Sequence, residues 1–471
     1  MSLGQLLDRR LIGLLQRRLV AGLAGTPASG LLSITLDLGQ GGDDWLGVDL
    51  TRNHVNWWAR APTSGSGECR LAIGRAMSFC TAGAARFPAL QAAFAGLSAV
   101  WRHDDQARTD VQPLAHVGFA FAPESVDQWP NARLLVPAIL LQNRGGRRTA
   151  TFSCVGAEAE GAVKRWLGEL QAASRPLDDS PPVSALRRRA NVLAEQVFLA
   201  RARAALADIA GGKLDKLVLA RSLNIDADET IAVAPLLALL LRRYPECTIY
   251  GVGHQGQGLF GATPERLVAL RGDRVQADAL AGTAWLGAAA TDQPGSLTLQ
   301  DGKNRREQQL VVDAVHAALV PLCASLALPQ AAEVMQLRGL QHLRTTVCGR
   351  LRQGVGFFDL LAALHPTPAV GGWPAAVAGE WLQAHGEQRG AWYSGGLGWV
   401  DRCGDGEAVV VLRCARIERT RAELFAGAGI VAGSQPAQEL AETEAKLAVI
   451  ADALQHARYA RPPLAGRTGT R

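Results

Sequence analysis

Residues 424–446 run Leu424-Phe-Ala-Gly-Ala-Gly-Ile-Val-Ala-Gly-Ser-Gln-Pro-Ala-Gln-Glu-Leu-Ala-Glu-Thr-Glu-Ala-Lys446, and their pattern changes halfway along. The first part has the apolar character of a β-strand and ends in a turn that is rich in glycine. Ser434 and Pro436 are typical of the first positions of a helix, and the remaining residues have helical periodicity. The stretch therefore predicts a strand, a turn and a helix in direct succession.

Three glycines, Gly427, Gly429 and Gly433, lie at this predicted turn. Glycine lets the backbone turn sharply and approach a bound molecule closely. The turn therefore favours a ligand site at the first turn of the helix. A dinucleotide site uses a similar turn, but the third glycine stands one position late and no later strand supplies the acidic residue that binds ribose. We therefore do not expect a nicotinamide cofactor.

The helix that follows carries Glu439, Glu442 and Lys446 at spacings of three and four residues, which places them on one face. A solvent-exposed helix carries the same residues, and for an arbitrary helix that interpretation would be preferred. A further acid, Glu307, lies on the apolar face of a helix predicted over 303–322, where it needs a partner. Together the three glutamates would suit Mg²⁺ shared with an anionic ligand.

Length and composition describe a globular chain. It has 471 residues, of which 48% are hydrophobic and 20% are charged, so it can bury a large core, and its length predicts two or three domains. Residues 6–19 form a basic amphipathic pattern, which predicts a surface helix rather than a signal peptide. No segment approaches the ~20 apolar residues that a membrane-spanning helix needs. We therefore expect a cytoplasmic protein with no membrane partner.

Cysteine spacing and charge argue against two further classes of protein, those with zinc or redox-dithiol sites and those that bind nucleic acid. The eight cysteines are scattered, with no C-x-x-C pair and no nearby histidine cluster, so neither a zinc site nor a redox dithiol is expected. The net charge is +6, but Lys and Arg are spread along the chain without the interleaved aromatic residues of a nucleic-acid surface. We expect no nucleic-acid partner, and the positive charge favours small anionic substrates.

Strands outnumber helices and do not alternate strictly with them. Period-two patterns predict strands at 31–36, 54–59, 69–73, 117–121, 134–141, 149–154, 216–225, 248–253, 334–352, 392–400, 407–417 and 423–430. Helical patterns cover 183–210, 233–243, 303–322, 356–363 and 374–385. This order favours an α+β architecture of layered sheets over a doubly wound parallel sheet.

Four ionisable side chains in the second half have two interpretations each. Lys216, at the start of an apolar strand, either extends to solvent or lies in a cavity with a lowered pKa. Glu265 follows a turn and by itself resembles a surface carboxylate, and His342 by itself resembles a strand histidine with its hydrogen bonds satisfied. Arg413 stands in a run that is otherwise buried by pattern, and a buried arginine usually binds a carboxylate.

Taken together, the segments resemble the chorismate-utilising enzymes. The matching segments, in chain order, are 216–221 (Lys-Leu-Val-Leu-Ala-Arg), 260–267 (Phe-Gly-Ala-Thr-Pro-Glu-Arg-Leu), 279–283 (Ala-Leu-Ala-Gly-Thr), 303–307 (Lys-Asn-Arg-Arg-Glu), 341–343 (Gln-His-Leu), 365–372 (His-Pro-Thr-Pro-Ala-Val-Gly-Gly), 392–399 (Trp-Tyr-Ser-Gly-Gly-Leu-Gly-Trp), 411–415 (Val-Leu-Arg-Cys-Ala) and 427–446. They cover residues 213 to about 450, whereas the first 200 residues match only in size and strand-rich character.

The resemblance implies one catalytic domain of two layered, mostly antiparallel sheets with helices packed outside. Residues 1–200 would form a divergent N-terminal half of the sandwich, residues 201–460 the chorismate-binding region, and residues 461–471 a flexible tail. The domain count that length predicts would then be too high.

Three positions indicate the branch of the family that forms isochorismate by adding water to chorismate. Lys216 is the lysine that water-adding members have, Ala281 stands where aminodeoxychorismate synthases have lysine, and Ala369 stands where the salicylate- and anthranilate-forming branches tend to have threonine. A salicylate-forming enzyme that also eliminates pyruvate is the alternative within the family. A relative that binds chorismate without converting it is the alternative outside enzymes.

The resemblance also implies roles. Lys216 would deprotonate the attacking water and Glu265 would protonate the departing hydroxyl, which requires a lowered lysine pKa and a raised glutamate pKa. Mg²⁺ on Glu307, Glu439 and Glu442 would bind the ring carboxylate. The implied substrate contacts are Gly282, Thr283, His342, Ala369, Tyr393, Arg413, Gly427, Ala428, Gly429 and Lys446. No glutaminase subunit is expected, and the chain would be a monomer.

Two residues depart from the family pattern. Gln308 replaces a common histidine after the helix glutamate, and Thr263 replaces a common serine before the Pro-Glu pair. Neither departure removes an implied acid, base or metal ligand.

Overall fold

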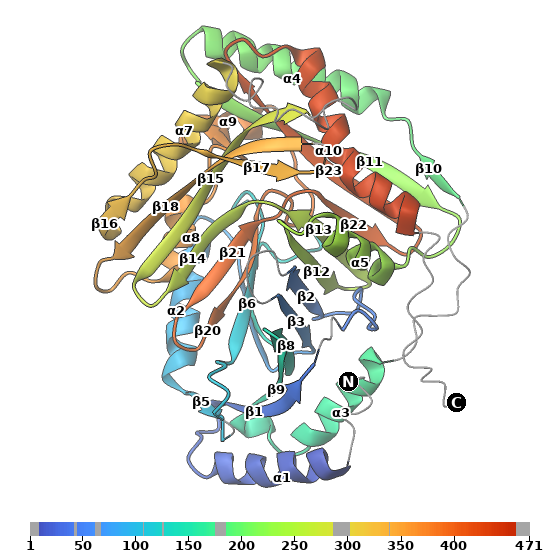
Figure 1. Cartoon of the computed structure of the whole chain (residues 1–471), viewed down its shortest axis with the longest axis vertical. Coiled ribbons are helices and arrows are strands. Elements are labelled where there is room, and N and C mark those ends of the chain that lie inside the picture. The colour runs from blue at the N-terminus through green and yellow to red at the C-terminus, as the bar shows by residue number, and fades with distance from the viewer. Residues whose placement is uncertain are drawn as a thin grey trace.

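Two large β-sheets and ten helical segments make up the described part of the protein, which the computed structural model gives for residues 9–41, 45–61, 67–106, 108–124, 127–174, 185–285, 302–338 and 340–457. The sheets lie face to face and the helices cover their outer sides (Figure 1). The α+β architecture with two mostly antiparallel sheets, expected from the sequence, is confirmed. Residues 461–471, the predicted tail, lie outside the described residues.

The larger sheet, called sheet A here, has thirteen strands among the described residues. In spatial order they are β10 (Leu186–Arg188), β11 (Lys216–Ala227), β23 (Arg421–Val431), β22 (Cys414–Glu418), β13 (Gln257–Thr263), β12 (Thr248–His254), β2 (Asn56–Arg60), β3 (Glu68–Ile73), β8 (Ile139–Arg144), β9 (Arg147–Val155), β1 (Leu31–Gln40) and β5 (Trp101–Asp104), with β19 (Gly372–Trp373) paired to β11. β1 and β5 are parallel, and the other strand pairs described in this sheet are antiparallel.

The second sheet, sheet B, has ten strands among the described residues. Its order is β16 (Cys323–Ala327), β18 (Leu340–Leu351), β15 (Arg274–Trp285), β14 (Arg266–Arg271), β21 (Gly406–Val410), β20 (Gly396–Asp401), β6 (Leu114–Phe119), β7 (Ala132–Val136) and β4 (Met77–Thr81), with β17 (Glu333–Leu337) paired to β18.

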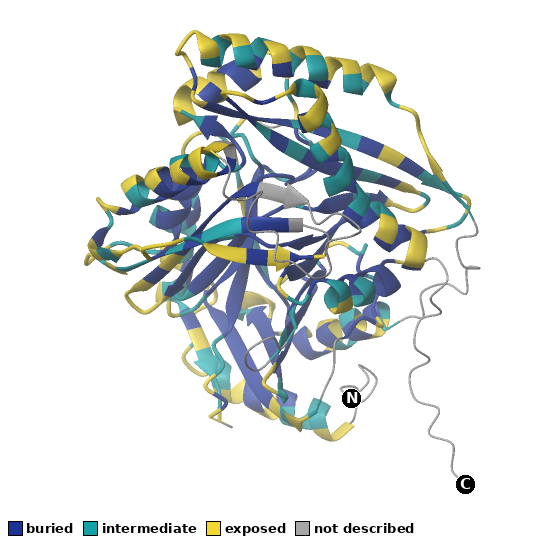
Figure 2. Cartoon of the chain, turned by 45° about the horizontal axis from the view of Figure 1, so that its top comes forward, coloured by how far each residue is buried: buried dark blue, intermediate teal, exposed yellow. Residues whose placement is uncertain are grey.

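The helices lie on the outer faces and turn their exposed sides to solvent (Figure 2). They are α1 (Arg9–Leu23), α2 (Arg86–Ala99), the 3₁₀ helix η2 (Gly156–Glu158), α3 (Ala162–Ala173), α4 (Val192–Ala210), α5 (Val233–Arg243), α7 (Gly302–Leu319), α8 (Phe357–Leu364), α9 (Ala375–Ala384) and α10 (Pro436–Ala457). As far as the structure describes the chain, none of these helices is both long and apolar enough to cross a bilayer.

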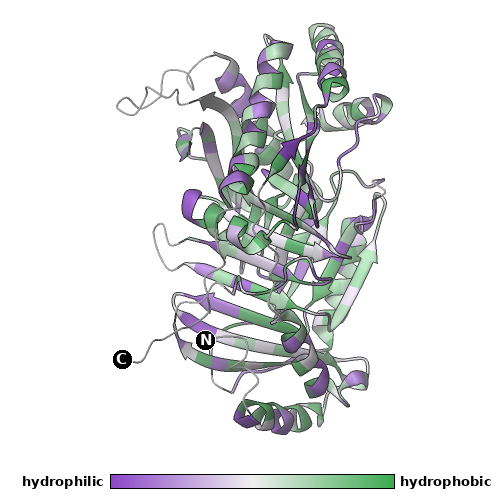
Figure 3. Cartoon of the chain, turned by 90° about the vertical axis from the view of Figure 1, so that its right-hand side faces the viewer, coloured by the Kyte–Doolittle hydropathy of each residue, from purple (hydrophilic) through white to green (hydrophobic). Residues whose placement is uncertain are grey.

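Helix α1 confirms the surface helix that the N-terminal pattern predicts. It carries hydrophilic and hydrophobic residues on different sides, as the bottom of Figure 3 shows. Leu15 and Leu19 pack into the core, and Arg18 is buried beside them. The Arg18 guanidinium donates to Asp104 at 2.8 Å and to the carbonyl of Thr35 at 2.8 Å, so its charge is compensated inside the protein.

Three buried layers follow from the two sheets. The outer face of sheet A, with Trp57 and Leu71, packs under α1, α3, α5 and α10. The outer face of sheet B, with Val117 and Leu134, packs under α2, α7 and α8. Between the sheets lies an aromatic cluster that includes Trp392. Both faces of most strands are therefore buried, which explains why continuous apolar runs are as common in this chain as strict alternation.

Two predicted strands are each divided between the sheets. The run 134–141 splits at Pro137 into β7 of sheet B and β8 of sheet A, and the run 407–417 splits into β21 of sheet B and β22 of sheet A. Proline has no N–H for a ladder, which explains the first break. At the second break Arg413 has a φ of 47°, so the chain turns there and Arg413 lies in a connection rather than in a strand.

The helix predicted over 183–210 is also shorter than expected. It begins at Val192, where the side chain of Asn191 accepts a hydrogen bond from the N–H of Ala194 at 3.2 Å and caps the helix. Residues 186–188 form β10 instead, and 183–184 lie outside the described residues.

Each half of the chain contributes one continuous block of strands to each sheet, and the two blocks join in the middle of the sheet. β2 pairs with β12 in sheet A, and β6 pairs with β20 in sheet B. Neither half has a sheet of its own. We therefore propose one structural domain for the described residues, in place of the two or three that length predicts.

Candidate active site

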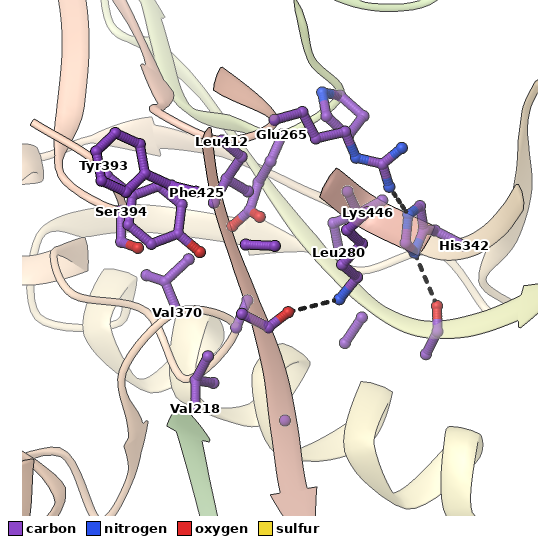
Figure 4. A pocket seen from close by; sticks show the side chains of 18 of the residues that line it. Val218, Glu265, Leu280, His342, Val370, Tyr393, Ser394, Leu412, Phe425 and Lys446 are labelled. Atoms are coloured by element: carbon purple, nitrogen blue, oxygen red, sulfur yellow. Dashed lines mark hydrogen bonds between the residues drawn. The ribbon is translucent and has the colours of Figure 1, made fainter. Parts of the chain in front are cut away.

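A pocket opens between the two sheets where β11, β23, β15 and β18 meet (Figure 4). It is lined by Val218, Pro264, Glu265, Leu280, Ala281, Gly282, Glu307, His342, Ala369, Val370, Tyr393, Ser394, Leu412, Arg413, Phe425, Ala426, Gly427, Gly429 and Lys446. Ten of these residues are among the site residues expected from the sequence. Segments almost 230 residues apart in the chain, from Val218 to Lys446, therefore form one site.

Lys216 does not extend to solvent, because its side chain is only 1% exposed. Its Nζ donates to Oε1 of Glu307 at 2.8 Å, and Glu307 lines the pocket. β11 carries Lys216, which is not itself among the residues that line the pocket, and α7 carries Glu307, which is. Burial of an ammonium group is costly unless a charge compensates it, and Glu307 supplies that charge. Lys216 is therefore buried directly behind the pocket wall at Glu307 and does not reach solvent.

Gly427 and Gly429 lie inside β23 rather than in a turn, so the sequence interpretation of these two glycines is wrong in part. Of the three glycines, Gly433 is the one with a positive φ, 89°. At Gly429 an added Cβ would lie 2.6 Å from Oε1 of Glu307 and 3.1 Å from Cε of Lys216. The glycine is therefore needed for space, since Lys216 and Glu307 meet directly above the backbone.

Gly429→Ala is expected to lower turnover on the order of 10-fold, because the added methyl group would displace the Lys216–Glu307 pair. The measurement is steady-state turnover alongside thermal unfolding. Gly379→Ala in α9 is the matched control, since a Cβ at Gly379 meets no atom within 4 Å. Equal activity of the two variants would contradict the role assigned to the space above Gly429.

Glu265 enters the pocket from the turn between β13 and β14 and is 3% exposed. Burial raises its pKa to about 8, and the charge of Asp278 acts in the same direction, whereas Lys216 and Lys446 oppose the shift. Its Oε1 has no hydrogen-bond partner among the described residues. Glu265 is therefore a protonated acid at neutral pH with an oxygen available to a ligand.

The two departures from the family pattern have structural roles. The hydroxyl of Thr263 accepts a hydrogen bond from the N–H of Glu265 at 3.3 Å, so it holds the turn that presents the acid. Gln308 is buried and donates to the carbonyl of Ala279 at 3.1 Å and to the hydroxyl of Thr345 at 3.0 Å. Gln308 thus ties α7 to sheet B beside the pocket.

Arg413 and His342 form a chain of hydrogen bonds at one side of the pocket (Figure 4). Nη2 of Arg413 lies 2.6 Å from Nε2 of His342, and Nδ1 of His342 lies 3.0 Å from the carbonyl oxygen of Gly282. A guanidinium can only donate, so Nε2 accepts and the proton of the neutral ring is on Nδ1. Burial, followed by the charges of Arg413 and Lys446, holds the pKa of His342 well below its usual value.

The neutral His342 therefore orients Arg413 without adding charge. Nη1 of Arg413 is buried and has no hydrogen-bond partner among the described residues. A carboxylate placed in the pocket would complete the donor geometry of this guanidinium.

Helix α10 contributes Lys446 to the pocket wall. Its Nζ donates to the carbonyl of Gly427 at 3.0 Å and forms an ion pair with Glu442 at 2.7 Å. Glu439 is 1% exposed at the start of the same helix. Neither Glu439 nor Glu442 lines the pocket, although Glu307 does. Of the three residues on the predicted face of α10, Lys446 is therefore the one that reaches the pocket wall.

The three predicted metal ligands match a hard cation in kind but are not gathered into one group. Carboxylates are the ligands that Mg²⁺ prefers. Across the described ranges, no three His, Cys, Asp or Glu side chains lie close enough together to hold one ion. Glu307 and Glu442 each face a lysine, Lys216 and Lys446 respectively. The carboxylate donors therefore fit Mg²⁺ in kind. In this structure Lys216 and Lys446 compensate the charges of Glu307 and Glu442, which a bound ion would also neutralise.

Four other residues were predicted to contact the substrate, and they do not all lie at the pocket. Ala369 and Tyr393 line the pocket. Ala428 has its side chain on the opposite face of β23, in the cluster under α4 and α9. The backbone of Thr283 pairs with His342 in the ladder of β15 and β18, and its side chain lies outside the described part.

Arg389 supports the pocket and was not found from the sequence. It is 8% exposed and donates to the carbonyl groups of Val370 at 2.6 Å and Val218 at 2.8 Å, both of which line the pocket. Glu387 compensates its charge at 2.8 Å. This pair therefore joins the strand of Lys216 to the loop of Ala369. A Glu-x-Arg pattern in a loop has the same spacing in an exposed ion pair, so no sequence signal distinguishes it.

A protonated acid and an arginine with an unpartnered donor thus share one pocket, and a buried base candidate, Lys216, contacts Glu307 in its wall. Such a set can remove a proton from one group and deliver a proton to another within an anionic ring substrate.

Comparisons with known proteins agree with this chemistry. The model of the family described as "Chorismate binding enzyme" matches residues 49–455. The isochorismate synthase MenF of Bacillus subtilis (strain 168) is 32% identical over 364 residues, which cover 75% of this chain and 77% of that protein. The salicylate biosynthesis isochorismate synthase of Pseudomonas aeruginosa is 35% identical over 277 residues, 58% of each chain.

Solved structures show the same fold. The menaquinone-specific isochorismate synthase MenF from Escherichia coli superposes with a TM-score of 0.75 at 25% identity, covering 94% of this chain and 99% of that one. Anthranilate synthase component I from Streptococcus pneumoniae TIGR4 superposes with a TM-score of 0.66 at 19% identity, over 81% of this chain and 92% of that one. The second likeness concerns the fold alone.

Proposed function

The chain belongs to the chorismate-binding enzyme family, and on that premise we propose that it is an isochorismate synthase, which converts chorismate to isochorismate. The observation that supports the mechanism is an acid in the pocket that is protonated near pH 7, together with a buried lysine that contacts Glu307 in the pocket wall. The activity is an isomerisation, because a hydroxyl is added at one ring carbon and lost at another.

Lys216 and Glu265 divide the chemistry between them. Lys216, in its neutral form, takes a proton from a water molecule, and the oxygen of that water forms a bond to ring carbon 2. The ring double bonds shift as the carbon–oxygen bond at carbon 4 breaks. Glu265 gives its proton to the departing hydroxyl, which leaves as water. One water enters and one leaves, so substrate and product are isomers.

Arg413 and the backbone of β23 orient the substrate. Chorismate is a dicarboxylate, and the unpartnered Nη1 of Arg413 suits one of its carboxylates. Because Gly427 and Gly429 have no side chain, the substrate can lie against the strand. Ala369 and Tyr393 bound the ring on the other side. His342 acts through Arg413 and does not exchange protons, since its pKa is too low.

Mg²⁺ is part of this proposal. Glu307, Glu439 and Glu442 would hold it, directly or through water, and when bound it neutralises the ring carboxylate of chorismate. Glu307 would then be shared between the ion and Lys216, with which it pairs at 2.8 Å. Lys446 then has the substrate as an alternative partner to Glu442.

Ala369 and Ala281 support the isomerase over the other branches. Both side chains line the pocket and are apolar, so neither places a hydroxyl or an ammonium group beside the ring. Salicylate synthase, which adds the elimination of pyruvate, is the second candidate activity. A relative that only binds chorismate is the third. The presence of both Lys216 and Glu265 in the pocket region favours conversion over binding alone.

Incubation of the purified protein with chorismate and Mg²⁺ is expected to yield isochorismate, with little salicylate and little pyruvate. An excess of isochorismatase coupled to the reaction measures the first product, and salicylate fluorescence measures the second. EDTA should abolish turnover, and added Mg²⁺ should restore it, because the substrate carboxylate would lose its counter-ion. Salicylate and pyruvate in equal amounts would identify the salicylate synthase, and ligand binding without any product would identify the silent relative.

We further propose a monomer in the cytoplasm that needs no glutaminase subunit, since water rather than ammonia is the nucleophile. All eight cysteines are free thiols, which fits a reducing compartment.

A further inference from the structure

The layer between the sheets is polar in the N-terminal part of the sandwich. On sheet A, Trp58 stands opposite Arg70, and Arg70 stands opposite Gln142. On sheet B, His116 stands opposite Trp399. The two sides meet, since the guanidinium of Arg70 lies 3.9 Å from the centre of the Trp399 ring. The apolar residues of the same strands point outward to the helices. In most sandwiches the apolar residues instead face each other between the two sheets, so the pattern is inverted here.

Many polar atoms of this layer have no hydrogen-bond partner among the described residues. They are both amide atoms of Asn56, Nε1 of Trp58, Nε and Nη1 of Arg70, Nε2 of His116, Nη1 of Arg133, Oε1 of Gln142 and Nε1 of Trp399. Every one of these side chains is less than 9% exposed. A buried polar group without a partner destabilises the folded state. So many of them in one layer indicate that it holds water or a ligand that pairs with them.

Arg133 gives this layer an uncompensated charge. It stands opposite Gly118, is 3% exposed and, within the described ranges, has neither an ion pair nor a hydrogen bond. Burial lowers its pKa to about 10, so it stays charged at neutral pH. Arg70 and Arg60, which approach the same layer, are compensated by Glu68 and Glu407.

The histidines around Arg133 are neutral, so they neither add to its positive charge nor supply a negative one. His54 and His116 are pushed toward the neutral form by burial first, and the pKa values are lowered to about 4 and about 3. Burial also lowers the pKa of His254 and Arg133 acts in the same direction, whereas a hydrogen bond with the backbone of Gln128 and the charge of Asp127 oppose the shift. One buried positive charge therefore has no counter-charge, which is strongly unfavourable unless an anion accompanies it.

We propose that the inter-sheet layer is a second binding site, separate from the catalytic pocket, that holds a small monovalent anion on Arg133. One uncompensated guanidinium calls for one negative charge. A fully buried layer suits a small anion such as chloride or a short carboxylate. The indole and amide N–H groups of Trp58, Trp399 and Asn56 supply further donors in the layer.

Trp392 separates the two sites. Its ring lies 5.1 Å from the guanidinium of Arg133, and its indole N–H donates to the carbonyl of Pro130 at 2.8 Å. The next residue, Tyr393, lines the catalytic pocket. The anion therefore stabilises the wall behind the pocket without touching the substrate, and its binding does not depend on the proposed activity.

The test is thermal unfolding at constant ionic strength, with chloride or acetate replacing the larger gluconate ion. The wild-type melting temperature is expected to rise saturably with the small anion, because a ligand that binds the folded state stabilises it. Arg133→Met should show no such rise and should be at least as stable as the wild type in gluconate, since it removes an unpaired buried charge. Chloride and acetate arms distinguish a halide site from a carboxylate site.

Arg350→Met is the control, since Arg350 is exposed and already paired with Asp273, and it should keep the wild-type anion response. Crystals soaked in bromide should show an anomalous peak beside Arg133. A wild-type response that is absent, or equal in Arg133→Met, would overturn the proposal, as would a map with water alone beside Arg133. Chorismate turnover measured on the same samples keeps this outcome distinct from that of the proposed function.

Discussion

Replacing Lys216 by alanine is expected to reduce the turnover of chorismate by about 100-fold or more, because the attacking water would lose its base. The side chain is buried and in contact with Glu307, so no neighbouring surface lysine can take its place. The measurement is kcat for isochorismate formation, coupled to an excess of isochorismatase. Lys213→Ala is the matched control, because Lys213 lies three residues earlier, is 72% exposed and pairs with Asp208.

Loss of structure must be separated from loss of the base. Lys216→Met keeps most of the length of the side chain and fills the space above Gly429, so its melting temperature is expected to stay closer to that of the wild type. It should be as inactive as the alanine variant. Near-normal turnover of either variant would remove Lys216 from its catalytic role.

Glu265→Gln is expected to cost about 100-fold or more as well, since an amide cannot protonate the departing hydroxyl. Its second effect is on pH dependence. Burial raises the pKa of Glu265 to about 8, so the acid is protonated below that pH and loses its proton above it. A general acid works in its protonated form, and kcat/KM should therefore fall as pH rises through about 8.

The residual activity of Glu265→Gln should lack this high-pH limb, because the titrating group is gone. Glu333→Gln, an exposed carboxylate paired with Arg344, should keep both the activity and the limb. A wild-type profile that stays flat between pH 7 and 9, or a limb that persists in Glu265→Gln, would assign the proton to another group.

Local sequence patterns predicted the elements of the fold better than their membership in the sheets. The run 134–141 was expected as one strand, but it supplies β7 to one sheet and β8 to the other. Both sheets are buried on two faces, so the apolar pattern does not change where the chain crosses between them. Which sheet a strand joins depends on partners far away in the chain, and no local spacing contains that information.

The same limit applies to the site. Glu307 could be nominated from its apolar helix face and Glu265 only from the family motif, and both line the pocket. The sequence predicts a turn at Gly429, but the residue instead leaves space for the side chain of Lys216, which lies 213 residues earlier in the chain. Arg413 was expected in a strand, and its positive φ shows that it lies where the chain crosses between the sheets. Arg389 was missed, because its burial arises from long-range packing.

The pairing of β2 with β12 also has a consequence for how this protein is made. About 190 residues separate the two strands, so β2 leaves the ribosome long before its neighbour exists. Until then the nascent chain carries an unpaired strand edge next to Trp57 and Trp58, and such edges invite pairing with other chains. Closing the sheet demands contacts of high sequence separation, which slows folding and lengthens that exposure. The protein therefore depends on assistance or on low concentration during synthesis more than its buried, well-packed final state suggests.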